Sequence, residues 1–555
     1  MRPNNLLMIG VLLSPAPLGA QPTLSTPRDS ALHVLNRLAY GATPGLLDRI
    51  TQEGVLRWID RQLAVTTTDD PGLRNVLSRF DLLTTSQDEL ARSYFEVQRE
   101  RRADRRNAGA DSAMNTMSPA ERARRAPPEA RELRDLIMQT PQLVLVRAVS
   151  SDYQLAEVMA DFWSNHFNIF MGKNVARVYL PSYIEETIRP RIFGRFEDLL
   201  IATAKSPAMM VYLDNALSVM PGARPPQQGR MAARRRSGFG LRARPGMDPR
   251  LDSARMALEE RRPTGLNENY ARELMELHTL GVDGGYTQKD VTEVARILTG
   301  WSVARPAQGS GFVFNGWAHD RGAKTVLGVD FPAGKGQDEA VRLLEMLARH
   351  PSTAHYIGAK LCARFVSDTP PDGCVDNAVS AWKRSGGEMR EVLRAIFRSP
   401  DFWAPVNRSA KVKSPLEFVV SAVRVVGGAP DTTPRLAGAV GRLGQPLFQH
   451  VAPNGYPELE KDWVNSGALL NRMNFAMQLA ANRLPGVTVD LDRVLPVMAD
   501  HAALVDAVDR LVLGGKMTPQ TRSVIKEQIA QLTDPGQARA FALGLAIGGP
   551  EFQKQ

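Results

Sequence analysis

The chain has 555 residues, 43% of them hydrophobic, 23% charged, and a formal net charge of +10. This length can bury a large core. A basic balance suggests nucleic acid, but here the positive charge is concentrated in two segments rich in Arg, Ala, Pro and Gly, residues 97–134 and 222–262. We interpret both as disordered basic insertions, with an anionic envelope surface as the alternative partner. A nucleic-acid partner is therefore not expected.

The first 20 residues have the parts of a secretion signal. Arg2 supplies a positive charge, Leu6–Leu13 is apolar, and Ala20 is the small residue before a cleavage site. The apolar run is too short to cross a bilayer. A buried N-terminal helix is the alternative, which the following prolines disfavour. We expect residues 1–20 to be removed, a periplasmic or secreted mature protein, and no transmembrane segment after cleavage.

Two cysteines occur, Cys362 and Cys374, with the turn-forming sequence PPDG just before Cys374. An exported protein meets an oxidising compartment, where such a turn can bring two thiols together. A disulfide and two free thiols both remain open, because pairing geometry cannot be read from sequence. The absence of a CxxC pair argues against a thiolate metal site.

Helix signals dominate the remainder, and they predict a mostly α-helical single body over residues 27–555. Thr43 is an expected N-cap followed by Pro44 at the first helical position. Thr287 and Asp290 have capping-box spacing before an apolar stripe. Strand signals are few, and the best of them predicts a short β hairpin-like element near residues 311–330.

Several strings resemble a bacterial family, the domain of unknown function 1800 family. They include "LNRLAYGATPG", "MADFWSNHFNIF", "GLNENYARELMELHTLGVDGGYTQKDV", "HDRGAKTVLG", "KVKSPLEFVVSAVR" and "GQPLFQHVAPNGYP", and they run nearly the full mature length. The ending "GGPEFQ" departs from the usual Ser-Pro-Glu-Phe pattern. The resemblance implies an exported, mostly helical protein without an established activity. It also implies a possible partner, a secreted alkaline-phosphatase-like protein encoded by a neighbouring gene.

Residues 265–282 gather an unusual number of polar side chains. On an α-helix Arg272 lies four residues from both Glu268 and Glu276, so it can pair with either carboxylate. This spacing predicts a buried or half-buried ion network that joins helices. We assign five residues to this structural polar network, two of them from the string "DFWSNHF": Glu268, Asn269, Arg272, Asp161 and Asn165.

A chemical site is the alternative interpretation of the same strings. Its candidate catalytic residues are His166, Glu273, Glu276 and His278. Glu273 and His278 diverge on an α-helix, so they need partners from another element, and His166 is the nearest source. The usual role of an imidazole in such an aromatic setting, however, is that of a core histidine bonded to a carbonyl, and we favour this interpretation for His166. The Glu-x-x-His spacing of di-iron bundles is absent, and any metal or cofactor stays unknown.

A second candidate site lies in "WAHDRGAKTVLG". His319 and Asp320 can form an acid–base pair with Lys324 as a cationic anchor. A turn in which Asp320 caps and Lys324 is solvated explains the same residues.

Two classes of function follow. The first is an exported binding or assembly factor for another envelope or secreted protein. The second is an envelope enzyme, hydrolytic or metal-dependent, with a His/Glu site between helices 155–170 and 266–280. We favour the first, because the chain has no GxSxG, Walker, GxGxxG or HExxH motif.

Overall fold

The computed structural model describes residues 26–66, 70–107, 121, 126–173, 175–223, 265–304 and 309–555. The expected signal peptide and most of the second basic segment, residues 224–262, lie outside these ranges. Helices make up most of the described chain, as the sequence predicts. None of the described helices combines the length and the apolar character needed to cross a bilayer.

The first half of the chain forms a series of helices, of which α10 (Gln154–His166) carries most of the string "DFWSNHF". They are α1 (Pro27–Leu38), α2 (Leu46–Glu53), α3 (Val55–Leu63), η1 (Pro71–Leu73), α4 (Arg74–Leu77), η2 (Asp81–Leu83), α5 (Gln87–Asn107), α8 (Pro128–Ile137), α9 (Gln139–Ser150), α10 (Gln154–His166), α11 (Ala176–Ser182), η3 (Tyr183–Ile188), η4 (Arg189–Arg191), α12 (Phe196–Lys205), α13 (Pro207–Tyr212) and η5 (Asn215–Leu217).

The second half adds a further set of helices. They are α16 (Asn269–Glu273), η6 (Leu274–Thr279), α17 (Gln288–Leu298), α18 (Gln337–Arg349), α19 (Pro351–Phe365), α20 (Asp372–Ser385), α21 (Met389–Phe397), α22 (Pro400–Trp403), η8 (Pro405–Asn407), α23 (Pro415–Val425), α24 (Arg435–Arg442), α25 (Glu460–Trp463), α26 (Ser466–Ala480), α27 (Leu491–Val494), α28 (His501–Val508), η9 (Asp509–Leu513), α29 (Pro519–Ile529), α30 (Pro535–Gly548) and α31 (Pro550–Gln553).

The described strands form three small antiparallel pairs. β1 (Trp301–Val303) pairs with β2 (Phe312–Phe314), β3 (Lys324–Val326) with β4 (Val329–Phe331), and β5 (Ala429–Pro430) with β6 (Val487–Thr488). The first two pairs confirm the β element expected near residues 311–330.

Of the two helix N-caps predicted from the sequence, one is present in the structure and the other is not. Thr287 and Asp290 form a reciprocal capping box at the start of α17. At α2 the helix begins after Gly45 rather than after Thr43, because Gly45 takes a left-handed conformation (φ 77°) that ends the preceding turn. Pro44 therefore lies in the turn, and α2 has no side-chain cap.

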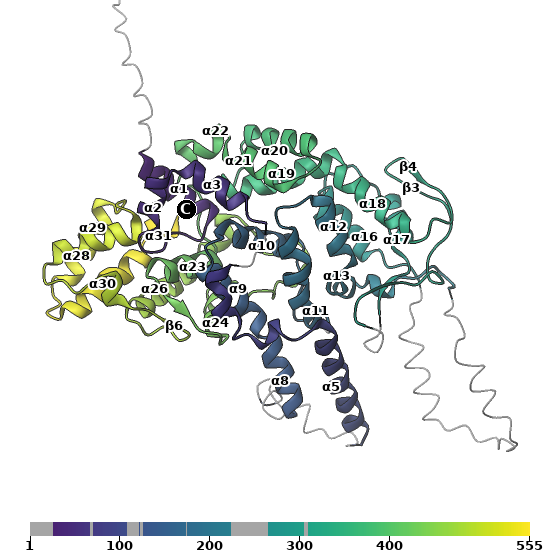
Figure 1. Ribbon diagram of the computed structural model, residues 1–555, viewed down its shortest axis with the longest axis horizontal. Coiled ribbons are helices and arrows are strands. Elements are labelled where there is room, and N and C mark those ends of the chain that lie inside the picture. The colour runs from purple at the N-terminus through teal and green to yellow at the C-terminus, as the bar shows by residue number, and fades with distance from the viewer. Residues whose placement is uncertain are drawn as a thin grey trace, which may run out of the picture.

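The first basic segment begins and ends in helices. Residues 97–107 complete α5, and residues 128–134 lie in α8, which packs beside it. Both ends of the segment are thus helical where we expected disorder, because Arg, Glu and Ala are strong helix formers. Figure 1 shows α5 and α8 projecting together from the body.

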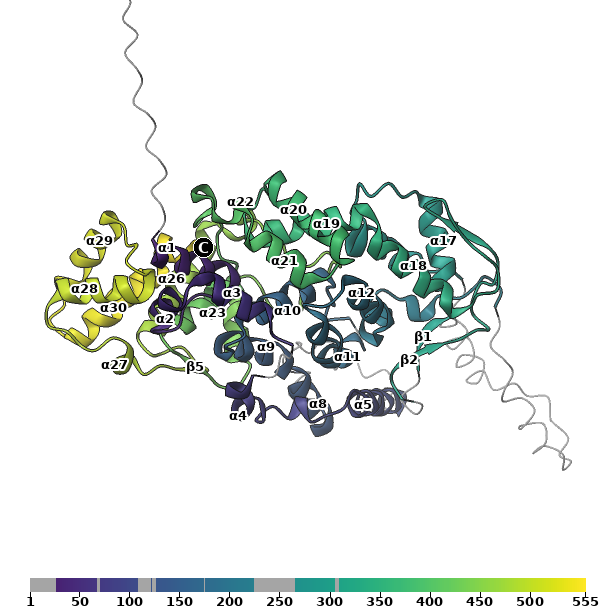
Figure 2. The ribbon, with the colours of Figure 1, turned by 45° about the horizontal axis from the view of Figure 1, so that its top comes forward.

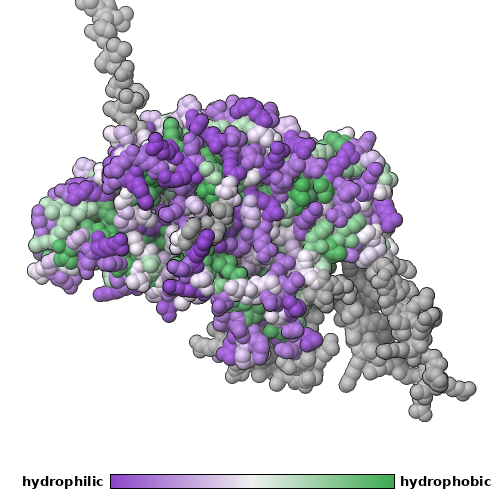
Figure 3. Space-filling view, in the orientation of Figure 1, coloured by the Kyte–Doolittle hydropathy of each residue, from purple (hydrophilic) through white to green (hydrophobic). Residues whose placement is uncertain are grey.

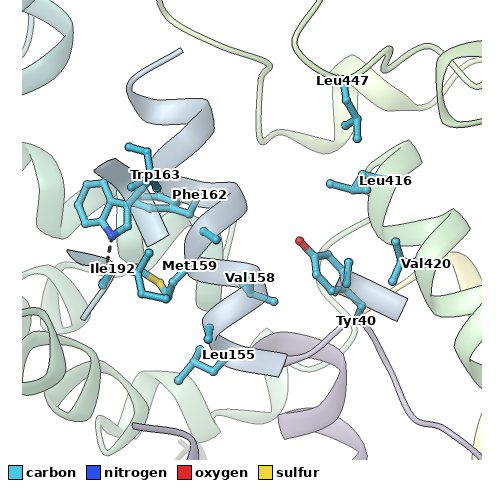
Figure 4. Packing of buried hydrophobic residues seen from close by; sticks show 14 of the residues in the cluster. Tyr40, Leu155, Val158, Met159, Phe162, Trp163, Ile192, Leu416, Val420 and Leu447 are labelled. Atoms are coloured by element: carbon cyan, nitrogen blue, oxygen red, sulfur yellow. Dashed lines mark hydrogen bonds between the residues drawn. The ribbon is translucent and has the colours of Figure 1, made fainter. Parts of the chain in front are cut away.

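The helices gather around one connected cluster of buried hydrophobic residues that extends from Ala31 to Phe552. Both views place the C-terminal helices α28–α30 at one end, beside α1 and α2, and the short strands β1–β4 at the other (Figures 1 and 2). On the face seen in Figure 3, hydrophobic residues lie among hydrophilic ones at the end formed by α28–α30. Helix α10 crosses the middle of the cluster. There Tyr40 lies between α10 and the α23 residues Leu416 and Val420, and Trp163 donates to the Ile192 carbonyl at 3.2 Å (Figure 4).

Candidate functional site

The stretch 265–282 changes helix type inside the polar string. Residues Asn269–Glu273 are α-helical, whereas Leu274–Thr279 form a π-helix. The amide of Leu280 donates to the Met275 carbonyl, and the hydroxyl of Thr279 donates to the Leu274 carbonyl, both five residues back. Spacing rules for an α-helix therefore do not hold after Glu273. Short π-helical segments are frequent at functional sites.

This change explains where Arg272 lies. Its guanidinium is 3.7 Å from Glu268 and donates to Gln288 at 2.7 Å, and 41% of the side chain is exposed. Glu276 accepts a hydrogen bond from the hydroxyl of Tyr286 at 3.1 Å instead. Glu268 also accepts from Gln288 at 2.8 Å and from Thr292 at 2.7 Å, so a polar network does join this helix to α17, but without Glu276. An ion pair as exposed as Arg272–Glu268 contributes about 0–1 kcal/mol. The side-chain amide of Asn269 donates a hydrogen bond to the Leu213 carbonyl.

His166 and His278 meet in the interior, together with a lysine that the sequence did not indicate. Nε2 of His166 lies 3.2 Å from the His278 carbonyl oxygen, so this nitrogen carries the hydrogen and Nδ1 is the acceptor. Nζ of Lys360, from α19, lies 3.0 Å from that Nδ1. Burial lowers the pKa of His278 to about 3 and the pKa of Lys360 to about 8. Neither ring nitrogen of His278 has a described partner.

The two candidate glutamates lie nearer the surface than the histidines. Glu273 and Glu276 are both half-buried. Partial burial raises the pKa of Glu273, the neighbouring Glu276 raises it further, and Arg272 opposes the shift. Tyr356, one turn before Lys360 on α19, has a pKa raised by burial and by Glu276. The π-helix and α19 thus share one polar boundary.

The side chain of Asn165 binds a loop of the protein itself. Its amide nitrogen donates to the Tyr456 carbonyl at 2.8 Å, and its amide oxygen accepts from the Tyr456 N–H at 2.7 Å. Asn168 donates to the carbonyls of His450 (3.1 Å) and Ala452 (2.8 Å). The end of α10 therefore docks residues 448–456, the string "FQHVAPNGY".

A close backbone approach makes this docking possible. Gly455 has φ 73°, and a Cβ placed there would lie 2.2 Å from the Asn165 carbonyl oxygen. Only glycine fits such a position without displacing the loop.

Asp161 faces a cavity beneath that loop. The cavity has a volume of about 40 Å³ and is bordered by Tyr40, Ser164 and Asn165. Burial raises the pKa of Asp161 to about 7, against the opposing effect of Arg364. A space of this size holds a few water molecules and no organic substrate. Asp161 and Asn165 therefore lie together, but apart from Glu268 and Arg272.

The second candidate site is a buried ion cluster. Nζ of Lys324 lies 2.6 Å from Glu339, a residue of α18 that the sequence analysis missed, and both side chains are buried. Nδ1 of His319 donates to the Thr299 carbonyl at 2.9 Å, and its Nε2 lies 3.6 Å from Glu339.

Asp320 does not pair with His319. Its carboxylate accepts from Arg296 at 2.8 Å and from the Gly322 N–H at 2.9 Å, the latter as a turn would. Lys324 is buried rather than solvated because Glu339 neutralises it. The residues thus combine the expected turn with an ion pair across to α18.

A disulfide joins Cys362 to Cys374, with Cα atoms 6.1 Å apart, and so connects α19 to α20. Within the bridged segment Asp368 pairs with Lys411 and accepts from the Glu460 N–H at 2.7 Å. The helix that carries Lys360 is therefore fixed at its C-terminal end.

A much larger hollow than the cavity at Asp161 lies elsewhere. A groove of about 900 Å³ lies between α1–α2 and the C-terminal helices. Its accessible apolar lining comes from separate parts of the chain: Leu32, Ala42, Pro44, Val494, Met498 and Leu511. On one side of the groove, Gly514 packs closely against α1 and α2. A Cβ atom added to Gly514 would lie 3.1 Å from Leu47 and 3.2 Å from Leu32.

Charged residues border the groove unevenly. Five cationic side chains line it, Arg28, Lys413, Arg510, Lys516 and Lys554, against the acids Asp48 and Glu551. Lys413 is buried at the base, where it donates to the Phe552 carbonyl at 2.7 Å, and burial lowers its pKa to about 7. Sequence reasoning missed this groove, although two of the quoted strings, "YGATPG" and "KVKSP", contribute to it.

Within the described part of the chain, no group of three or more His, Cys, Asp or Glu side chains has the arrangement of a metal site. The polar motif residues bond mainly to one another and to backbone, whereas the groove is open and mostly apolar. The structure thus defines a mostly helical protein with a large open groove. The chain belongs to the family described as "Protein of unknown function (DUF1800)", whose model matches residues 33–554 and confirms the resemblance. Comparisons with curated proteins and with solved structures find no match.

Proposed function

We propose that this protein is a binding or assembly factor for another envelope or secreted protein, and that the groove holds a segment of that partner. One observation carries the proposal: the groove of about 900 Å³ with an accessible apolar lining. Open apolar surfaces of this extent are typical of interaction sites.

The use of the polar motif residues supports binding over catalysis. Both ring nitrogens of His166 have partners, Lys360 and the His278 carbonyl, so His166 has no free nitrogen for a substrate proton. Lys324 and Glu339 neutralise each other in the interior. These residues position helices in the interior, whereas the groove is lined by other elements, α1, α2, α23 and the C-terminal helices.

An extracytoplasmic location is part of the proposal. It is supported by the secretion-signal pattern of residues 1–20 and by the disulfide between Cys362 and Cys374, since disulfides persist in oxidising compartments. The first partner to test is the secreted alkaline-phosphatase-like protein that the family resemblance implies.

The test uses the purified mature protein and that purified candidate in a pull-down and in calorimetry. Leu511→Asp places a charge in the groove lining, and we expect binding to fall at least tenfold. Leu511 is half-buried, so a thermal melt first checks that its variant is folded. Val524, on α29, is exposed and lies outside the groove lining, so Val524→Asp is the control. Equal binding by wild type and both variants would contradict the groove as the site.

An envelope enzyme is the second candidate, favoured by the boundary between the π-helix and α19. There Glu273 has a raised pKa and Lys360 a lowered one, and groups with such shifts cluster at catalytic sites. A Glu273→Gln variant that stays as stable as wild type but loses function would support it. Elemental analysis showing a stoichiometric metal would also support it.

A further inference from the structure

The charged residues of the groove differ in whether they already have partners. Arg28 pairs with Asp48, and Lys516 lies 2.5 Å from Asp29. Glu551 accepts from the N–H and the hydroxyl of Thr518, at 3.1 and 2.6 Å. Both acids of the groove are therefore already neutralised or bonded.

Two cations of the groove remain. Arg510, at the π-helix η9, and Lys554, at the end of α31, are both exposed. Neither side chain forms an ion pair or a hydrogen bond with another described residue. They come from different elements but border the same apolar lining, so two cations without a partner stand beside the hydrophobic base, against one acid without a counter-charge, Glu551.

The start of α2 adds little to this charge. The amide of Leu46 donates to the Thr43 carbonyl at 3.0 Å, and Asp48 in the first turn opposes the positive end of the helix dipole. The positive charge of the groove therefore comes from Arg510 and Lys554. An occupant with basic residues would be repelled here, and a purely apolar one would leave Arg510 and Lys554 unpaired.

We propose that the groove binds an extended polypeptide segment that combines apolar side chains with Asp or Glu, its apolar side chains against Leu32, Met498 and Leu511 and its carboxylates at Arg510 and Lys554. This inference rests on the proposed function and names the chemistry of the partner segment. The apolar residues supply most of the affinity, and the two cations select the charge.

The test is an array of random 12-residue peptides probed with the full mature protein, followed by fluorescence anisotropy of selected peptides. We expect bound peptides to be enriched in Asp or Glu together with Leu, Ile, Val or Phe. Raising NaCl from 50 to 500 mM should weaken them several-fold, because salt screens exposed charges. The double variant Arg510→Glu/Lys554→Glu should weaken acidic peptides about tenfold and favour basic ones.

Two variants separate the possible failures. Arg131 and Arg442 do not line the groove, so Arg131→Glu/Arg442→Glu makes the same change of net charge as the matched control and should bind like wild type. Peptide binding without acidic enrichment, or unaffected by the Arg510/Lys554 reversal, overturns the inference but leaves the proposed function. If wild type binds no peptide more tightly than the Leu511→Asp variant does, both this inference and the proposed function are overturned. Binding of a fluorescent long-chain fatty acid, together with no peptide binding, assigns the groove to a lipid and also overturns both.

Discussion

Nζ of Lys360 lies 3.0 Å from Nδ1 of His166, and the other nitrogen of the same ring donates to the carbonyl of His278. One imidazole thus connects α10, the π-helix η6 and α19, three elements far apart in the sequence. A general base needs a nitrogen that can reach a substrate proton. Because both nitrogens of His166 are already bonded, we assign the ring to positioning these helices.

His166→Ala should therefore cost stability and function together. The change leaves the Lys360 amine and the His278 carbonyl without partners and creates a cavity, so we expect a loss of about 2–4 kcal/mol in the free energy of unfolding. Urea denaturation and a complementation assay measure the two effects. A variant as stable as wild type but inactive would instead indicate a catalytic histidine.

Substitution of two arginines compares an ion pair at the surface with a buried ion pair. Arg272→Ala should change the free energy of unfolding by about 1 kcal/mol or less, because its guanidinium is 41% exposed. Arg189 instead binds both carboxylate oxygens of Glu157, at 2.7 and 2.8 Å, in the interior. Arg189→Met leaves that carboxylate buried and uncompensated, which costs about 3–5 kcal/mol. Similar losses for both variants in urea denaturation would show that Arg272 is more buried than we describe.

Buried histidines make the protein sensitive to acid. Burial lowers the pKa of both His33 and His278 to about 3, so each stays neutral in the folded state below pH 6.5 but takes up a proton on unfolding. Their contribution is fully present at pH 7 and is lost as the pH falls from 6.5 towards 3. We expect His278→Gln to reduce the slope of stability against pH by about 1.4 kcal/mol per pH unit between pH 6 and 4.

Urea denaturation at half-unit steps of pH measures that slope. His355 is exposed on α19, so His355→Gln is the matched control and should leave the slope at its wild-type value. An unchanged slope in His278→Gln would mean that the His278 ring is open to solvent.

The loop docked by Asn165 depends on one glycine. A Cβ on Gly455 would lie 2.2 Å from the Asn165 carbonyl oxygen, so Gly455→Ala should displace the loop and break both Asn165–Tyr456 hydrogen bonds. Gly328 has a similar φ of 76° but nothing within 4 Å of its Cβ, so Gly328→Ala isolates the backbone strain. We expect Gly455→Ala to cost about 2 kcal/mol more than Gly328→Ala. Hydrogen exchange at Tyr456 reports the undocking, and wild-type protection in Gly455→Ala would contradict it.

Local signals in the sequence were sufficient for much of the fold. The capping box of Thr287 and Asp290 and the β element near residues 311–330 depend on neighbours within a few residues, and both are present. The helix start near Pro44 was placed two residues too early, because Gly45 ends the turn before α2. Such errors at helix boundaries are local.

The candidate sites depend on contacts that local patterns do not contain. The π-helix at Leu274–Thr279 invalidated the α-helical spacing from which we paired Arg272 with Glu276. Lys360 is 194 residues from His166, and Glu339 is 15 residues from Lys324, across a hairpin and into another helix. The groove likewise combines the N-terminal helices with residues after 490, so a single sequence carried no signal for it.

The most direct test of the groove as the binding surface is photo-crosslinking in cells. A benzophenone amino acid is placed at Leu511, in the groove lining, and in a separate strain at Val524, exposed on α29 outside that lining. Crosslinked species are purified and identified by mass spectrometry. We predict that the Leu511 probe joins the chain to one extracytoplasmic protein, through a segment with apolar and acidic residues, and that the Val524 probe does not. No adduct at Leu511, or the same adducts at both positions, would contradict the groove as the partner-binding surface.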